Sequence, residues 1–226
     1  MAPLAKENGP ASDTVKALDA IEKTVYEVVK AYGFKKHGRT LHRFVSGDIS
    51  QLINFQLGQA YRGETHLLIV NVGIRVPECV TRSFHAQGEI KKYYKEYECN
   101  IRSCLGEIEG KALSCYDLRN SADAIAEDIL RQIQNIVVPA FKVLKTRDDI
   151  LAKRRNYPYL DLFNNHLILL EEAMIYGRRG ERAIATEKFI SYYNSVKEKQ
   201  DKTGNTMTGH LSYLEGLALK LGIELN

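Results

Sequence analysis

The most informative absences in this sequence are those of catalytic signatures. It contains no glycine-rich phosphate-binding loop, no nucleophile elbow and no metalloprotease helix motif. Its histidines are scattered, with no pair at ligand spacing on a predicted helix. These absences favour a protein that is not an enzyme, and no cofactor is expected.

The four cysteines also lack a recognisable arrangement. Cys79, Cys99, Cys104 and Cys115 form no Cys-x-x-Cys pair, so zinc-finger and thioredoxin-like spacings are both excluded. We expect four reduced thiols, because a reducing compartment disfavours disulfides. We also expect no bound metal, since zinc needs about four converging ligands and the spacing, even with His85 added, does not indicate them.

Long apolar runs and a secretion signal are absent as well. No stretch of about 18 apolar residues occurs, so we expect no membrane-spanning segment and no membrane partner. Residues 1–12 lack the apolar core of a signal peptide and contain Pro, Gly, Asn and Lys, which predicts a disordered leader. Together these features predict a cytoplasmic protein.

Composition and length are those of a globular protein. The 226 residues are 44% hydrophobic and 27% charged, a balance that disordered chains do not show. The formal net charge of +4 is compatible with nucleic acid or an acidic protein as partner. Dedicated nucleic-acid binders are usually more basic.

The first half of the chain shows helical and then strand-like patterns. Apolar residues recur every three and four positions over residues 13–32, which predicts a helix ended by Gly33 in the left-handed conformation. Three alternating runs follow, joined by turn-like connections, and predict an antiparallel meander. These runs comprise residues 39–45, 49–57 and 65–76.

Shorter elements are predicted after the meander. Residues 101–108 and 112–118 have the pattern of two further strands, and residues 120–144 that of a helix which bends or ends near Val138 because Pro139 interrupts it. Between them and the meander, the spacing of Ile90, Tyr93, Tyr94 and Tyr97 predicts a short amphipathic helix packed on the sheet. The alternative is a platform on which nucleic-acid bases stack.

These patterns predict an α+β fold. Residues 13–145 should form a domain in which helices pack on one face of an antiparallel β-meander sheet. Residues 146–226 show helical periodicity alone and should form a small all-helical C-terminal unit.

The polar face of the meander is the predicted binding surface. Asn54, Gln56, Asn71 and Arg75 should come together there if the strands are adjacent, with Arg39 or His42 joining from the first strand. The alternative is an ordinary solvated face, or one covered by the helical unit.

A basic stretch precedes this face. Between Val28 and Gly47 the chain has no acidic residue but carries Lys35, Lys36 and Arg43 as a basic patch. Such charges often serve only to protect an edge strand or to favour a helix C-terminus. The alternative is a site for an acidic partner.

Several short motifs occur in a fixed order along the chain. They are Gly33-Phe34-Lys35-Lys36, Gly38-Arg39, Asn54-Phe55-Gln56, Asn71-Val72-Gly73-Ile74, Ile101-Arg102, Leu105-Gly106 and Val138-Pro139-Ala140-Phe141. This series resembles a bacterial family known as domain of unknown function 4304, over about residues 18–145. The resemblance implies an α+β domain and supplies no activity.

The sequence thus favours a non-enzymatic protein-binding module, such as an immunity or defence-associated factor, that holds a protein partner through the meander and the helical tail. One alternative is a nucleic-acid-binding protein that uses the basic stretch over residues 30–43. A second is a hydrolase that uses His42 or His66, for which no nucleophile or carboxylate partner can be named.

Overall fold

The computed structural model describes residues 13–58, 66–79, 92–110, 115–162, 165–203 and 208–225. The predicted leader, residues 1–12, lies outside them. The chain divides into two compact units. The first, here called the sheet unit, comprises the described residues between Met1 and Arg75 and between Ile90 and Phe163. The second, the helical unit, comprises those between Val76 and Glu89 and between Asn164 and Asn226.

The first helix forms as its pattern predicts. A short 3-10 helix, η1 (Lys30–Tyr32), extends α1 (Asp13–Val29), and Gly33 follows with a φ of 86°. Glycine adopts this left-handed conformation without strain. The buried face of α1 comprises Leu18, Ile21, Glu22, Val25 and Val29.

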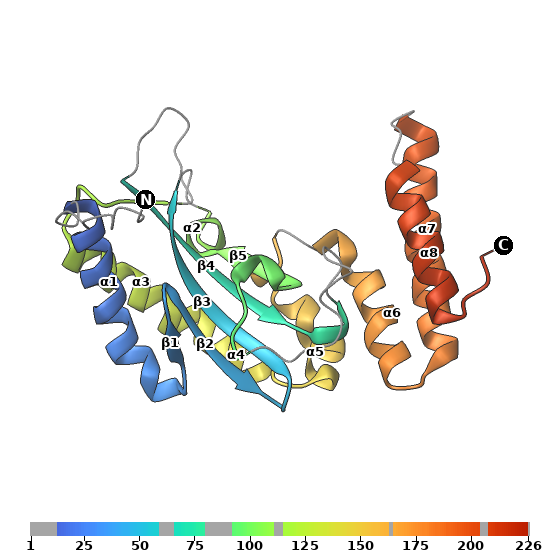
Figure 1. Ribbon diagram of the computed structural model, residues 1–226, viewed down its shortest axis with the longest axis horizontal. Coiled ribbons are helices and arrows are strands. Elements are labelled where there is room, and N and C mark those ends of the chain that lie inside the picture. Colours follow the sequence, from blue (N-terminus) through green and yellow to red (C-terminus); the bar gives the residue numbers. More distant parts are fainter. Residues whose placement is uncertain are drawn as a thin grey trace, which may run out of the picture. The chain divides into compact units, whose positions relative to one another are not determined.

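The sheet is six-stranded and antiparallel, so the predicted α+β class is confirmed (Figure 1). The strand order is β1-β2-β3-β4-β5, and β6 pairs with another part of β4. The strands are β1 (Lys35–His37), β2 (Thr40–Val45), β3 (Ile49–Gly58), β4 (Leu67–Arg75), β5 (Ile101–Cys104) and β6 (Tyr116–Asp117).

Two details differ from the prediction. β1 was not predicted, and within the described residues it pairs with only the first half of β2, Thr40–His42. The run over residues 101–108 is half strand and half helix, because α2 (Leu105–Ile108) follows β5 directly. Both β5 and β6 pair with β4.

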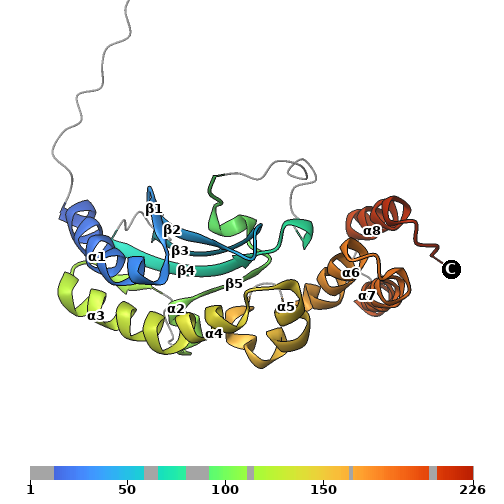
Figure 2. The same cartoon turned by 90° about the horizontal axis from the view of Figure 1, so that it is seen from below.

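The cross-strand register fixes which residues share a face of the sheet. Asn54 lies opposite both Thr40 and Asn71, so these side chains point to one side. Gln51 points to the other side, where its Nε2 donates hydrogen bonds to the backbone oxygens of Phe141 at 2.7 Å and Leu144 at 2.9 Å. Helices α3 (Ala122–Gln132) and α4 (Val138–Val143) lie on that side (Figure 2). We call it the helical face, and the opposite side the outer face.

The chain between α3 and α4 follows a wider path than an α-helix. Residues Ile133–Val137 form a π-helix, η5, and Pro139 stands at the beginning of α4. Since proline has no N–H and clashes with the preceding turn, regular α-helical hydrogen bonding cannot continue through it. The sequence predicts that the helix bends or ends near Val138; α3 ends at Gln132, and α4 begins at Val138 after the π-helical turn.

The sheet unit ends in short helices, namely α5 (Arg147–Lys153), η6 (Arg154–Asn156) and η7 (Pro158–Leu160). Thr146 caps α5, because its Oγ1 accepts from the backbone N–H of Asp149 at 3.0 Å. Arg147 binds Asp48, in the β2–β3 turn, with two hydrogen bonds of 3.0 Å. This bidentate pair ties α5 to the sheet.

The helical unit contains η2 (Pro77–Cys79), η8 (Asn165–Leu167), α6 (Ile168–Arg178), α7 (Arg182–Thr203) and α8 (Thr208–Leu221). Its buried side chains include Leu170, Phe189 and Leu214. No helix in the described part of the chain combines the length and the apolar character needed to cross a bilayer.

The tyrosine-rich segment differs from its prediction. Residues 93–95 are neither helix nor strand, and only η4 (Glu96–Glu98) forms a 3-10 turn, so the predicted amphipathic helix over Tyr93–Tyr97 is wrong. Ile90 lies outside the described residues. Tyr94 nevertheless packs on the sheet, in a buried cluster with Leu52 and Cys99. Residues 92–99 thereby cover part of the outer face (Figure 2).

Candidate functional site

The outer face carries a network of side-chain amides. Asn71 Nδ2 donates to Gln56 Oε1 at 3.1 Å and to Asn54 Oδ1 at 3.4 Å. Asn54 Nδ2 in turn donates to Thr40 Oγ1 at 3.0 Å and to the backbone oxygen of Arg39 at 3.4 Å. Because the network crosses three adjacent strands, it fixes the amides in place for contact with a ligand.

A pocket of about 450 Å³ opens beside this network. The pocket lies beside the end of β3 that extends beyond Asn54, the last residue of β3 paired with β2. The η4 turn lines its other side. Its polar lining residues include Arg39, Asn54 and Gln56 from the strands, and Lys95, Glu96 and Tyr97 from the turn. The pocket thus combines amides, both signs of charge and an aromatic ring.

A second pocket of about 430 Å³ shares Lys95 and Tyr97 and is completed by Tyr93 and Glu98. Tyr93 is 36% exposed and stacks on His37, and Tyr97 is 55% exposed. Phe44, which contacts Tyr94 edge to face, is 37% exposed. Exposed aromatic rings of this kind are enriched where proteins bind other proteins.

His42 holds the edge of this surface together. Its Nδ1 lies 3.1 Å from the backbone oxygen of Lys35, and its Nε2 lies 2.9 Å from that of Lys92. The imidazole therefore joins β1 to the segment over residues 92–99. Since both ring nitrogens face carbonyl oxygens and the side chain is buried, this geometry does not offer His42 to a substrate as a base.

The basic stretch is largely neutralised within the sheet unit. Glu22, buried in α1, lies 2.9 Å from Lys36 Nζ and 3.6 Å from Arg39 Nη1. Asp19 adds a contact of 3.1 Å to Arg39 Nη2. These pairs reduce the charge that the stretch presents to an acidic partner.

Arg43 is a structural residue on the helical face. Its Nε donates to Gln51 Oε1 at 2.9 Å, its Nη1 donates to the backbone oxygen of Tyr32, and its guanidinium lies 4.7 Å from the centre of the Phe34 ring. Burial lowers the pKa of Arg43. Among the predicted basic patch, Lys35 is exposed, whereas Arg43 points away from the outer face.

Arg75 lies on the outer face, four residues along β4 from Asn71. It is buried, and its guanidinium stacks on the Tyr94 ring at 3.8 Å from the ring centre. The structure therefore brings Arg39, Asn54 and Gln56 together at one pocket, with Asn71 bonded behind them. His42 and Arg75 occupy other positions on the same face.

The sequence did not single out Lys95, Glu96 or Glu22 as parts of this surface. Glu22 offered a signal, since it lies four residues after Leu18 and so falls in the apolar stripe of its helix. A carboxylate in that position requires a cationic partner, and the adjacent basic stretch supplies two. Lys95 and Glu96 gave no such signal, because only the 3-10 turn directs them to the pocket.

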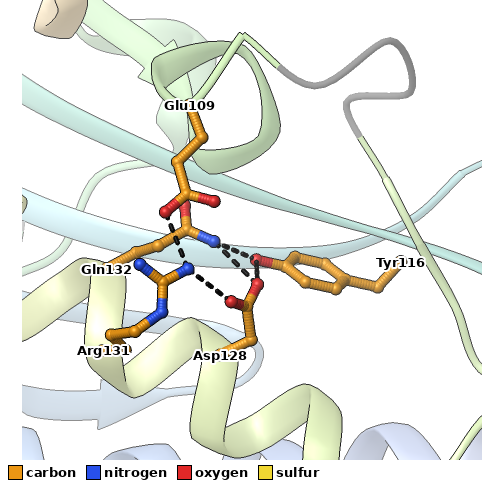
Figure 3. A network of polar contacts seen from close by, with 5 residues as sticks. All are labelled: Glu109, Tyr116, Asp128, Arg131 and Gln132. Atoms are coloured by element: carbon orange, nitrogen blue, oxygen red, sulfur yellow. Dashed lines mark hydrogen bonds and ion pairs between the residues drawn. The ribbon is translucent and has the colours of Figure 1, made fainter.

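A second polar cluster joins α2, β6 and α3 (Figure 3). Tyr116 Oη donates to Asp128 at 3.1 Å and accepts from Gln132 Nε2 at 2.7 Å. Arg131 Nη2 bridges Asp128 at 2.5 Å and Glu109 at 2.7 Å. The cluster thus ties the short strand and the short helix to α3.

A pocket of about 430 Å³ beside this cluster is lined in part by Cys115, Tyr116 and Asp128. Burial raises the pKa of Cys115, and Asp117 raises it further. Burial likewise raises the pKa of Tyr116, followed by the effect of Asp128. Since neither group is driven toward its anionic form, this pocket offers no activated nucleophile.

His66 has a carboxylate near it that the sequence did not reveal. Its Nε2 lies 4.0 Å from Asp117 Oδ1. Arg119 binds the same carboxylate from 2.9 Å, and this hydrogen bond is the main cause that lowers the pKa of Asp117 to about 2. Within the described residues, no three His, Cys, Asp or Glu side chains are grouped as metal ligands.

Comparisons with known proteins place the sheet unit in a family. No curated protein and no solved structure matches the chain. Residues 25–143, which include all six strands and the helices α2, α3 and α4, match the family described as a domain of unknown function, DUF4304. The chain therefore belongs to the DUF4304 family.

Proposed function

We propose that this chain is a non-enzymatic binding module that holds a protein partner on the outer face of its sheet. The single observation that carries the proposal is the 450 Å³ pocket between the amide network and the η4 turn. Amides with fixed positions give directional hydrogen bonds, and Lys95 with Arg39 supplies charge. This combination suits the polar surface of a folded protein or peptide.

The aromatic residues around the pocket support a protein as the ligand. Phe44, Tyr93 and Tyr97 expose large rings around the pocket. Tyrosine contributes a large contact area at a low cost in conformational entropy, and residues of this type often dominate binding energy at interfaces. A bacterial immunity or defence-associated role in the cytoplasm is the setting we infer, and the four cysteines, which form no disulfide, are compatible with it.

Affinity capture with matched variants tests the proposal. Tagged wild type, Tyr97→Ser and Lys95→Glu would each be expressed in the cells of origin, and captured proteins identified by mass spectrometry. The control variants are Leu219→Ser, which changes a side chain that is 83% exposed on α8, and Lys23→Glu on α1. Any partner is then purified, and its Kd for each variant is measured by calorimetry.

We expect one partner to bind wild type and both controls equally, and to lose at least about tenfold in affinity, or about 1.4 kcal/mol, with each outer-face variant. A partner that binds all five proteins equally would place the interface elsewhere. Absence of any partner that binds the purified wild type would refute the binding function itself.

A further inference from the structure

Arg75 is a buried cation with unsatisfied hydrogen-bond donors. Its side chain is 4% exposed, and its Nε and Nη1 have no hydrogen-bond partner within the described structure. The Tyr94 ring at 3.8 Å provides a cation–π contact, but a ring face accepts no strong hydrogen bond. A buried guanidinium is normally paired with a carboxylate or with several oxygen acceptors.

A second unsatisfied polar group lies directly beside it. Ser50 of β3 pairs with Arg75 of β4 in the register of the sheet, so the two side chains are neighbours on the outer face. Ser50 is fully buried, and its Oγ also lacks a hydrogen-bond partner. Two adjacent buried groups that can both donate hydrogen bonds form a site prepared for an oxygen ligand.

The two carboxylates of the η4 turn take part in other contacts. Glu96 Oε2 accepts from Arg102 Nη1 at 3.4 Å. Glu98 Oε2 accepts from the backbone N–H of Lys95 at 2.8 Å, which closes the η4 turn. Neither carboxylate takes the place of the missing acceptor at Arg75.

We propose that Arg75 and Ser50 bind a carboxylate of the protein partner, from an Asp or Glu side chain or a C-terminus. The guanidinium supplies the charge and N–H donors, the serine hydroxyl supplies one further donor, and Tyr94 covers the bound group. A carboxylate fits better than a phosphate dianion because Glu96 and Glu98, whose charges act on the Cys99 thiol as that of Arg75 does, add negative charge in this region. This assignment rests on the proposed function, since it names the chemistry that the partner brings to the same face.

The ligand reaches Arg75 past Tyr94 and Phe44. The segment that carries Tyr94 has no regular secondary structure over residues 93–95 and joins β2 through the contact of His42 with the Lys92 oxygen. Phe44, whose ring meets that of Tyr94 at 6.0 Å between centres, is already partly exposed. The aromatic pair therefore forms the border of the carboxylate site.

Titration of the purified chain with small anions tests the inference without the partner. The carboxylate probe is N-acetyl-glutamate with its α-carboxyl amidated, called N-acetyl-glutamate below, which carries a single carboxylate. The second probe is inorganic phosphate, sodium chloride at matched ionic strength is the reference, and the readouts are Tm and Kd by calorimetry. The variants are Arg75→Gln and Ser50→Ala. Ser103→Ala is the matched control, because Ser103 is an equally buried serine without a hydrogen-bond partner but lies on the helical face.

We expect N-acetyl-glutamate to raise the Tm of wild type and of Ser103→Ala in a saturable way, and more than phosphate does. Ser50→Ala should weaken its Kd about tenfold, the effect of one hydrogen bond to a charged group, and Arg75→Gln should abolish saturation. If Arg75→Gln does not fold, the comparison of Ser50→Ala with Ser103→Ala decides alone.

Three results would overturn the assignment: no saturable effect of the carboxylate on wild type, equal effects on Ser50→Ala and Ser103→Ala, or tighter binding of phosphate than of N-acetyl-glutamate. The carboxylate site and the proposed binding function can be refuted independently of each other. A partner that is lost with Tyr97→Ser but retained with Ser50→Ala refutes the carboxylate site alone, whereas the absence of any partner refutes the proposed function whatever the anion titration shows.

Discussion

The ion pair between Arg154 and Asp161 yields the most quantitative prediction. The sequence presents Arg154 between Lys153 and Arg155 as part of a basic cluster, but the structure buries both Arg154 and Asp161, at 4% and 2% side-chain exposure. Arg154 Nε and Nη2 donate to Asp161 Oδ2 at 2.8 Å and 2.5 Å. Substitution Arg154→Met would leave the buried carboxylate without its cation.

Removal of one partner from a buried ion pair costs about 3–5 kcal/mol, because the remaining charge is uncompensated. At about 2–4 °C per kcal/mol for a protein of this size, the Tm should fall by about 6–20 °C. Lys153→Met is the matched control. It breaks an exposed pair with Asp149 and should lower the Tm far less, because solvent screens such pairs.

The pH dependence follows from the burial of Asp161. Burial raises the pKa of Asp161 to about 6, although Arg154 acts to lower it. Because this value exceeds the value of about 3.9 expected in an unfolded chain, the folded state binds the proton more tightly. The stabilisation is therefore full below about pH 4 and is lost as the pH rises through about 6. Without Arg154 the pKa rises further, so Arg154→Met should cost more at pH 8 than at pH 5.

Urea unfolding followed by circular dichroism at both pH values measures these differences. The double variant Arg154→Met with Asp161→Leu should recover most of the lost stability, since it removes both charges. Equal losses for Arg154→Met and Lys153→Met, or a double variant no more stable than Arg154→Met, would refute the reasoning.

Three further predictions concern packing, capping and charge. Gly73→Ala should lower the free energy of unfolding by about 1–3 kcal/mol in the same assay, because the new Cβ would lie 2.8 Å from the Cβ and Sγ of Cys99; a loss no larger than that of Gly58→Ala would contradict this. Thr146→Ala should cost about 1 kcal/mol through loss of the α5 cap, and an unchanged urea midpoint would count against it. Glu22→Gln should strengthen any salt-dependent binding to DNA or RNA, because it releases Lys36; filter binding that shows no change would argue against nucleic-acid binding by the basic stretch.

The central strands could be predicted because apolar and polar residues alternate along them, and this alternation indicates which side chains are buried. Ile49, Ile53 and Phe55 do face the helices, as their spacing requires. The same alternation applies to Arg43. It lies between Leu41 and Val45, two residues from each, and therefore points to the helical face. Its charge suggested a site for an acidic partner, whereas its place in the alternation of the strand predicts that its side chain is covered by the helices.

Other features depend on contacts that no local pattern encodes. β1 consists of Lys35, Lys36 and His37, and it is a strand only because the turn at Gly38 returns the chain along β2. The tyrosines of residues 93–97 have helical spacing, but packing of Tyr94 against Leu52 determines their conformation. The pocket between this segment and β3 could not be predicted for the same reason, since it requires two segments distant in sequence.

The π-helical turn at Ile133–Val137 has a consequence for the length of the chain. Such a turn accommodates one residue more than an α-helical path would, and each residue rotates an α-helix by about 100°. Deletion of one residue there would convert the turn to α-helix and keep the angular setting of α4, so that the carbonyls of Phe141 and Leu144 would still meet Gln51. The loss of one residue should therefore be tolerated at this turn, whereas the same loss within α3 would rotate α4 by about 100° and separate these carbonyls from Gln51.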